Sequence, residues 1–245
     1  MAEWYGEDLA YIHDVGFGGY ALGAAPGILE ILARSGIREG LVVDLGCGSG
    51  LWAKELTDAG YNVLGVDVSE AMVGISRSRV PEAEFRVASL FEADISSCNA
   101  VTAIGEVLNY LFDPANDGDR ALVRLFDRIH GALPPGGVFV FDVAEPGQVT
   151  RATPTRTFSE GGNWMVLVEK EEDRERETLT RRIVTFRKAG ECYRRTDEVH
   201  RLRLYGAADI ADKLRRAGFR VRVARGYGRY RLPKAHAVFV ARKPA

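Results

Sequence analysis

Short apolar runs alternate with amphipathic segments along most of this chain of 245 residues. The apolar runs predict buried strands at 41–45, 62–66, 84–87, 100–104, 138–143, 219–224 and 235–241. Helical spacing of apolar residues predicts helices at 21–33, 52–59, 70–78, 119–130 and 207–217. Strands that alternate with helices in this way predict an α/β fold built on a doubly wound, mostly parallel sheet.

The pattern changes between residues 155 and 205, where polar and apolar positions alternate with a period of two. Turn signals lie near 172–174 and 189–190, so we expect three or four antiparallel strands inserted into the parallel domain. The sequence predicts three parts. An N-terminal segment, 1–36, covers the site. An α/β core is formed by 37–150 with 206–245, and residues 151–205 form an inserted β lid.

The first twenty residues combine aromatic side chains with glycines, the latter at positions 16, 18 and 19. We expect them to fold over a site rather than to form a plain amphipathic helix. The aromatic and imidazole side chains are those of Trp4, Tyr5, Tyr11, His13, Phe17 and Tyr20.

A glycine-rich turn, Asp44-Leu45-Gly46-Cys47-Gly48-Ser49-Gly50, follows the first predicted strand of the core. Glycines allow φ > 0 and let a ligand reach the main chain at the carboxyl end of a strand, where open α/β sheets bind ligands. The spacing differs from the G-x-G-x-x-G of dinucleotide sites, and Asp44 is a poor neighbour for a diphosphate. Asp67, which ends the next strand, can accept hydrogen bonds from a ribose diol. These residues predict a ligand that has a ribose and a cationic group.

Composition excludes some classes of protein and leaves the role of charge open. The chain contains no run of 18 apolar residues, the length that would predict a membrane span. Its N-terminus lacks a signal-peptide pattern, and its three separated cysteines do not form a disulfide or zinc pattern. We therefore expect a cytoplasmic protein without a metal site. Residues 1–150 hold 22 acidic and 9 basic residues, whereas 151–245 hold 12 and 24. In the interpretation we favour, the two parts attract each other or a second subunit. In the alternative, the basic part faces an acidic substrate.

Three motifs resemble those of class I S-adenosylmethionine-dependent methyltransferases. The turn at 44–50 looks like the family's first motif, 65–72 looks like its second-strand motif, and 133–137 resembles the entry to its fifth strand. The matches cover roughly residues 40–143, and the tail around Leu214 and Gly218 is similar to the family's last helix and strand. The resemblance implies a Rossmann-like fold, S-adenosylmethionine as cofactor and methyl transfer as the reaction.

The resemblance also implies roles for residues of the cofactor site. Gly46 and Gly48, with Cys47 between them, would meet the methionine and ribose parts, and Asp44 would support the methionyl amino group. Asp67 would bind the ribose hydroxyls. The resemblance also implies that Val68, Ser89 and Leu90 contact the adenine. It implies that Gly105 and Glu106 border the methionine part and the reacting methyl group. Ser89 departs from the family's usual Asp, which puts a polar contact to the adenine amino group in doubt.

The segment 105–110 lies where this family places methyl acceptors, and it lacks the Asp/Asn-Pro-Pro-Tyr/Phe signature of nucleic-acid base methylation. Candidate catalytic residues are His13, Glu106, Tyr110 and His200, although packing roles are commoner for such histidines, as for His236. The leading hypothesis is methylation of N or O of a small molecule by a monomer or homodimer, with nucleic acid an unlikely partner. The alternatives are an RNA or protein methyltransferase, suggested by the basic 151–245 part, and a non-catalytic cofactor-binding protein.

Overall fold

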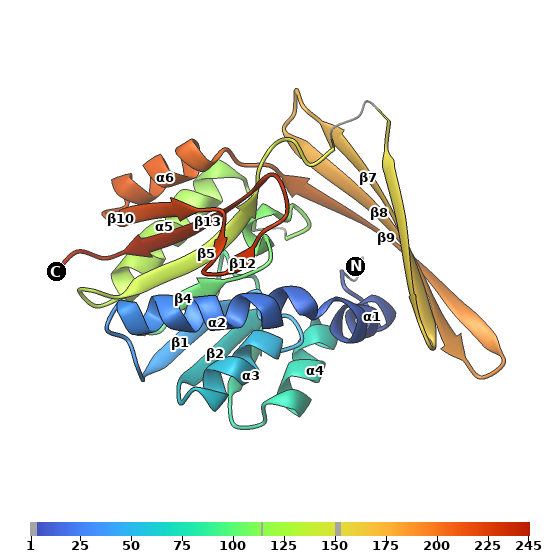
Figure 1. The fold of residues 1–245 in the computed structure, drawn as a ribbon, viewed down its shortest axis with the longest axis horizontal. Helices are drawn as coiled ribbons and strands as arrows, with labels where there is room; N and C mark the ends of the chain where they lie inside the picture. Colours follow the sequence, from blue (N-terminus) through green and yellow to red (C-terminus); the bar gives the residue numbers. More distant parts are fainter. Residues whose placement is uncertain (1–3, 114, 150–152) are drawn as a thin grey trace.

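A seven-stranded sheet in the order β10-β13-β5-β4-β1-β2-β3 forms the centre of the molecule (Figure 1). The computed structural model describes residues 4–113, 115–149 and 153–245. β13 runs antiparallel to β5 and to β10, and the other pairs are parallel, which confirms the predicted mostly parallel α/β fold. The strands are β1 (Leu41–Leu45), β2 (Asn62–Asp67), β3 (Glu84–Val87), β4 (Ala100–Ala103), β5 (Val138–Ala144), β10 (Arg220–Ala224) and β13 (His236–Arg242).

Helices cover both faces of this sheet because its strands are apolar on both sides. Val42 packs with side chains of α2, α3 and α4, whereas its neighbour Val43 packs with those of α5 and α6. The same alternation along β5 sends Val138 to the first layer and Phe139 to the second. The helices of the two layers are α2 (Gly19–Arg34), α3 (Leu51–Asp58), α4 (Glu70–Arg79), α5 (Asp119–Ala132) and α6 (Ala207–Arg216).

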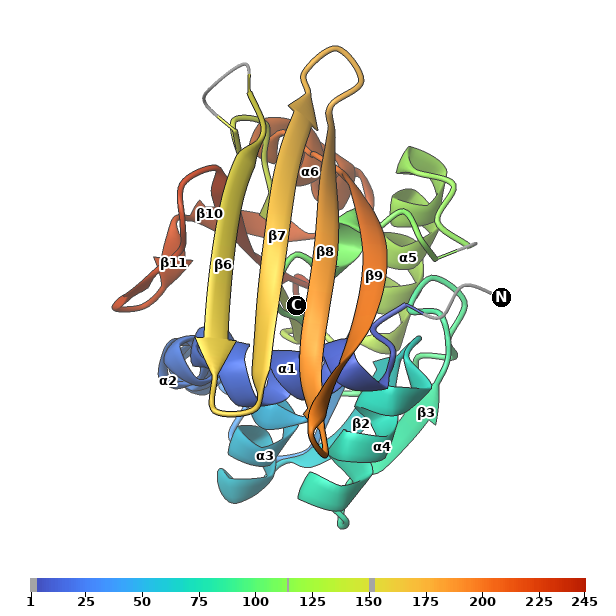
Figure 2. The ribbon, with the colours of Figure 1, turned by 90° about the vertical axis from the view of Figure 1, so that its right-hand side faces the viewer.

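The predicted meander is a separate four-stranded antiparallel sheet, which stands beside the central domain and is seen face-on in Figure 2. Its period of two turns Val166, Val168 and Lys170 toward the central domain, while Phe158 and Leu167 are exposed. The boundary predicted at 150 and 151 lies outside the described residues. The strands are β6 (Thr155–Gly161), β7 (Trp164–Asp173), β8 (Thr178–Ala189) and β9 (Cys192–Arg203).

The N-terminal segment corrects one expectation, because residues 7–17 form a helix, α1 (Glu7–Phe17). Two acidic residues in its first turn favour a helix N-terminus, and Gly16 near its end lets it approach the lid closely. A Cβ on Gly16 would lie 2.6 Å from the ring of Trp164 on β7. α1 therefore lies between the central domain and the four-stranded sheet (Figures 1 and 2).

Two smaller features complete the fold. A hairpin that the sequence pattern did not predict, β11 (Gly226–Tyr227) with β12 (Tyr230–Arg231), packs on α2 through the buried Tyr227. Within the described residues, no single helix is long and apolar enough to cross a membrane; α1 and α2 pass that test only as a pair, bent by 60°.

Candidate active site

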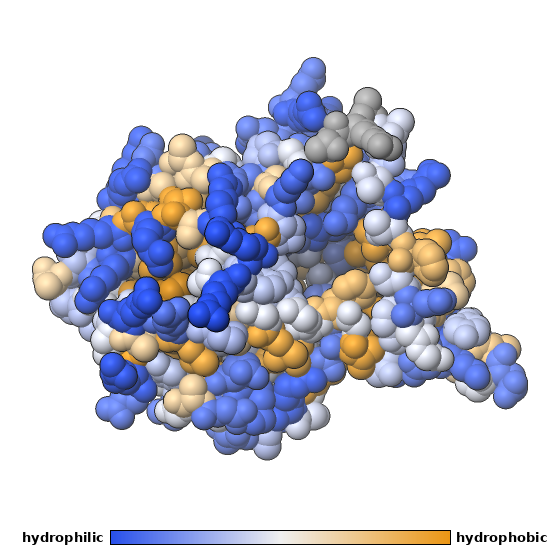
Figure 3. Space-filling view, viewed as in Figure 1, coloured by the Kyte–Doolittle hydropathy of each residue, from blue (hydrophilic) through white to orange (hydrophobic). Residues whose placement is uncertain are grey.

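A cavity of about 760 Å³ lies between the carboxyl ends of β1, β2 and β4 and the inner face of the four-stranded sheet. Figure 3 shows the hollow between these two parts, with hydrophobic residues along its edge. The wall of the cavity includes side chains of α1 and of residues at and around the η1 turn (Val107–Asn109). The glycine turn also forms part of this wall. One cavity therefore joins the predicted cofactor site to the lid.

The glycine turn presents its main chain to the cavity. Gly46 and Gly48 have φ of +72° and +53°, a region that favours glycine. A Cβ on Gly48 would meet no atom within 4 Å, so the space above it is open to a ligand. The Gly48 N–H donates to Asp67 Oδ2 at 2.9 Å, which ties the turn to the end of β2. Cys47, between the two glycines, is buried and also borders the cavity.

Two carboxylates lie beside this turn in different surroundings. Asp44 is buried and accepts a hydrogen bond from Thr102 Oγ1 at 2.7 Å, and Trp52 Nε1 donates to the same hydroxyl at 3.1 Å. Burial raises the pKa of Asp44 to about 7. Burial also raises the pKa of Asp67, although N–H groups of Ser69 and Gly48 oppose this. Asp67 keeps lone pairs for a ligand because each oxygen accepts one hydrogen bond from the protein.

The predicted adenine contacts are only partly in the wall. Val68 and Leu90 line the cavity, whereas Ser89 does not. Ser89 Oγ instead donates to Asp113 Oδ2 at 2.6 Å, and Asp113 lines the cavity. A carboxylate therefore lies beside Ser89 in the cavity wall, and it comes from a loop 24 positions further along the chain.

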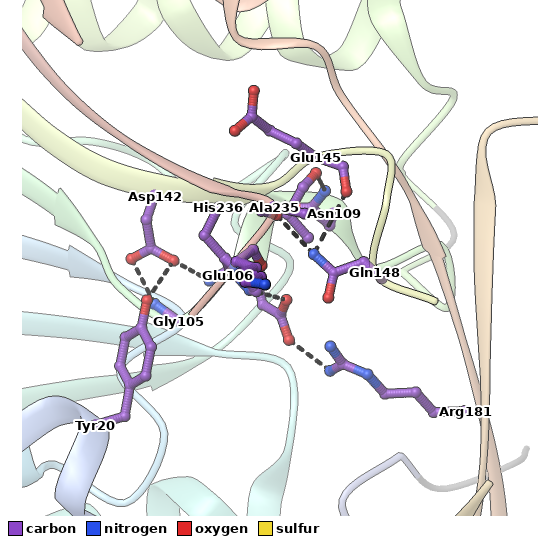
Figure 4. Close-up of polar contacts among 12 residues, drawn as sticks. Tyr20, Gly105, Glu106, Asn109, Asp142, Glu145, Gln148, Arg181, Ala235 and His236 are labelled. Atoms are coloured by element: carbon purple, nitrogen blue, oxygen red, sulfur yellow. Dashed lines mark hydrogen bonds and ion pairs between the residues drawn. The ribbon is translucent and has the colours of Figure 1, made fainter. Parts of the chain in front are cut away.

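Glu106 lies at the centre of a charged cluster from three parts of the chain (Figure 4). Arg181 Nη1 on β8 is 2.5 Å from Glu106 Oε1, and His236 Nε2 on β13 is 3.1 Å from Glu106 Oε2. Burial tends to raise the pKa of Glu106, but Arg181 and His236 outweigh burial and lower it to about 2. The carboxylate is therefore ionised at neutral pH.

Both ring nitrogens of His236 face oxygen atoms, an arrangement that favours the protonated imidazolium. Its Nδ1 is 2.9 Å from the Lys234 carbonyl oxygen, and its Nε2 faces the ionised Glu106; both partners only accept. Burial lowers the pKa of His236, but Glu106 outweighs burial and raises it. Sequence reasoning had favoured a packing role for His236, since nothing in the sequence predicts that it meets Glu106, 130 positions earlier.

Asp142, on β5, holds the turn that carries Glu106. It is fully buried and accepts four hydrogen bonds, from the N–H groups of Gly105 and Glu106 and from the hydroxyls of Tyr20 and Tyr227, at 2.6–2.9 Å. Glu106 has φ +56°, a strained conformation for a residue with a side chain. Asp142 fixes this conformation and so positions the Glu106 carboxylate. The sequence pattern did not single out Asp142, because it lies within an apolar strand.

The remaining predicted catalytic residues lie in three different positions. Tyr110 lines the cavity, and its hydroxyl lies 3.3 Å from Arg181 Nη1 and 3.0 Å from the Tyr5 hydroxyl. His13, on α1, also lines the cavity; burial lowers its pKa, and its buried Nδ1 has no hydrogen-bond partner among the described residues. His200 is fully buried outside the cavity wall, with Nε2 2.7 Å from Glu198 Oε2.

His200 contributes instead to the attachment of the N-terminal segment. Its ring packs against Trp4, Tyr5, Tyr110 and Phe112, with ring centroids 4.9–5.9 Å apart. Glu198 in turn accepts hydrogen bonds from the N–H groups of Tyr5 and Gly6. This cluster fixes the start of α1 to β9 and closes one side of the cavity.

The sequence and the fold of this chain are similar to those of known methyltransferases. A family model described as a methyltransferase domain matches residues 20–223. YqeM of Bacillus subtilis (strain 168), named as a methyltransferase, is 25% identical over 196 residues, covering 75% of this chain and 74% of that protein. The crystal structure of an S-adenosylmethionine-dependent methyltransferase from Clostridium acetobutylicum ATCC 824 matches with a TM-score of 0.81 at 19% identity, over 96% of this chain and 98% of that one. The sugar N-methyltransferase KedS8 from Streptoalloteichus sp ATCC 53650 matches with a TM-score of 0.78 at 19% identity, over 100% and 98%.

Proposed function

This chain belongs to the methyltransferase domain family and is a class I S-adenosylmethionine-dependent methyltransferase, and from that premise we propose that it methylates N or O of a small molecule. The acceptor binds in the cavity between Glu106 and the four-stranded sheet. The alternatives of an RNA or protein substrate and of a non-catalytic binding protein become outcomes of the tests below.

The residues of the donor end fit S-adenosylmethionine, which supplies a methyl group already activated on a sulfonium sulfur. The open space above Gly48 leaves room for a ligand, and Asp67 retains lone pairs for ribose hydroxyls. Asp44, beside the turn, offers a carboxylate to a cationic amino group. Val68 and Leu90 would contact the adenine, and Gly46, Cys47 and Gly105 would border the methionine part.

The observation that carries the small-molecule proposal is that one cavity joins this donor end to the lid. Its volume, about 760 Å³, lies within the range of small-ligand sites. Apolar side chains of β7 and β8, among them Val166 and Ile183, form part of its far wall, together with Lys170 and Arg181. KedS8, described as a sugar N-methyltransferase, shares the fold over the whole chain and supports an acceptor of this size.

In this proposal the protein does two things to the methyl acceptor: it orients the attacking atom, and one side chain takes up the proton that this atom loses. Methyl transfer needs a nucleophile held in line with the donor, and a fixed wall supplies this orientation. Glu106, held by Arg181 and His236, and Tyr110 would orient the acceptor. His13 would accept the proton that a nitrogen or hydroxyl loses, since its pKa is lowered and its Nδ1 is free of partners within the described part of the chain. His200 acts only through the position of α1.

Calorimetry with S-adenosylhomocysteine tests donor binding, and transfer of labelled methyl to a panel of amines, phenols and carboxylates tests turnover. We expect binding and at least one methylated acceptor. Absence of binding would refute the proposal, and binding without turnover on any acceptor would favour the non-catalytic alternative. His13→Asn should lower kcat and remove a limb of the pH profile, whereas His130→Asn, at the packed end of α5, should change neither.

A further inference from the structure

We propose that the methyl acceptor carries an anionic group, a carboxylate or a phosphate, which binds to Lys170 and Arg181 on the inner face of the lid. This inference rests on the proposed function, because it describes the acceptor of the same cavity. Two observations support it. One is the distribution of charge along the cavity wall, and the other is the position of two cationic side chains directly opposite each other on adjacent strands.

Charge in the cavity wall is divided by end. The carboxylates Asp44, Asp67 and Asp113 line the donor end, where a cationic donor binds. Every lysine and arginine of the wall, namely Lys170, Arg181 and Lys234, comes from the basic part of the chain. At that end, Glu106 is the one carboxylate among the wall residues described, and it already contacts Arg181 and His236. The lid end therefore has a surplus of positive charge.

Lys170 and Arg181 are direct cross-strand partners in the register of β7 and β8. Like charges placed directly opposite each other destabilise a sheet, so this pair costs stability unless something compensates it. Burial lowers the pKa of Lys170, and Arg181 lowers it further. Glu106 compensates Arg181, but Lys170 makes no ion pair or hydrogen bond with any described residue.

The other side of the same sheet shows the ordinary arrangement. Arg156 and Arg182 pair there with Glu169, at 2.7 and 3.4 Å. These two arginines, which face away from the cavity, thus find an acidic partner within the sheet. Lys170, which faces the cavity, does not, and an anionic ligand would be its partner.

The favoured interpretation of the charge asymmetry, attraction between the two parts of the chain, is also realised elsewhere. Asp8 on α1 contacts Arg187 and Arg194, and Glu145 contacts Arg225. These ion pairs hold the parts together without Lys170. The mutual attraction accounts for Arg181, which pairs with Glu106, but leaves Lys170 without an explanation. The acidic-substrate interpretation supplies one.

The test measures binding to the full chain loaded with S-adenosylhomocysteine, by calorimetry, and needs no turnover. The probes are tricarballylate for carboxylates, inorganic pyrophosphate for phosphates and tricarballylamide as the neutral match. Lys170→Gln is the variant, and Lys188→Gln, an exposed lysine near the end of β8, is the matched control. We expect at least one anion to bind the parent, to bind Lys170→Gln about tenfold more weakly, and to bind Lys188→Gln unchanged. Tricarballylamide should not bind.

Failure of both anions to bind the parent, or equal affinity of the bound anion for the parent and for Lys170→Gln, would overturn the inference. So would equal kcat/KM for acidic acceptors and their neutral amides in the methyl-transfer panel. The two anions separate a carboxylate from a phosphate source. Because S-adenosylhomocysteine binding and turnover are measured separately, these results leave the proposed methyl transfer itself standing.

Discussion

The two ends of the cavity are built in different ways. At the donor end, the turn after β1 and the end of β2 supply Gly46, Gly48 and Asp67, and the Gly48 N–H donates a hydrogen bond to Asp67. At the acceptor end, Glu106, Arg181 and His236 come from a turn, the lid and the last strand. Local geometry fixes the first end, whereas packing of distant elements fixes the second.

This difference predicts that the two ends fail separately when they are altered. A change at the donor end should weaken donor binding, whatever the acceptor. A change at the acceptor end should spare donor binding and reduce methyl transfer. Variants of Asp67, Glu106, Asp44 and Asp113 test this separation.

The largest effect is expected for Asp67→Ala. The carboxylate would accept two ribose hydroxyls, and each hydrogen bond to a charged group contributes about 1.5–3 kcal/mol. We expect S-adenosylhomocysteine to bind about 100-fold more weakly, as measured by calorimetry. Asp58→Ala, at the exposed end of α3, serves as the control. An Asp67→Ala affinity within threefold of the parent would contradict the ribose assignment.

The structure brings together the groups that the sequence assigns to the donor end because each of these features is local. A buried strand that ends in a glycine turn, followed by a strand that ends in Asp67, determines the relative position of these groups within one βαβ unit. Ser89 is different, because the carboxylate that it binds, that of Asp113, comes from a loop outside this unit.

The acceptor end was predicted only in part. Glu106 and Tyr110 were identified from their place after the fourth strand, and both line the cavity. Arg181 was one of many arginines on alternating strands, and a period of two gives the face but not what the face meets. His200 was singled out beside Arg201 and Arg203, yet the strand turns it toward Glu198 and the aromatic cluster.

The next largest effect is expected for Glu106→Gln. The amide leaves Arg181 and His236 without their counter-charge, and breaking a buried charge pair costs about 3 kcal/mol. The melting temperature should fall by about 6–12 °C, and methyl transfer should fall by about 30-fold, while S-adenosylhomocysteine affinity changes less than threefold. Glu171→Gln, exposed on β7, is the matched control. Loss of donor binding as large as the loss of turnover would show that the two ends are not separate.

Glu106 also makes a pH prediction with a definite sign. Its folded pKa of about 2 lies below the ordinary 4.5, so its contribution to stability is present above about pH 4.5 and is lost as the pH falls toward 2. Acid unfolding followed by circular dichroism should therefore be less steep in Glu106→Gln than in the parent. An identical acid profile in the two proteins would contradict this.

A smaller effect is expected from protonation of Asp44. Burial raises its pKa to about 7, and a cationic amino group binds the ionised carboxylate, so acid should weaken donor binding. The affinity for S-adenosylhomocysteine should fall by up to about tenfold from pH 8 to pH 6, and Asp44→Asn should bind weakly without this pH dependence. The stability contribution has the opposite sign, because a raised carboxyl pKa destabilises the fold as the pH rises through 7. A pH dependence retained in Asp44→Asn would assign it to another group.

The smallest effect is expected at Asp113. It tests whether a residue outside the motifs at the ends of β1 and β2 also contacts the donor. Asp113 lines the cavity and is held by Ser89 Oγ at 2.6 Å and by the Ala115 N–H at 3.0 Å. If it accepts a hydrogen bond from the adenine amino group, the parent should prefer S-adenosylhomocysteine to S-inosylhomocysteine, which lacks that group, by about fivefold. Asp113→Ala removes the acceptor and should abolish the preference, and Ser89→Ala should reduce it by loosening the carboxylate. Asp117→Ala, in the same loop but exposed, should keep it. An unchanged preference in Asp113→Ala would confine the donor end to the residues of its own motifs.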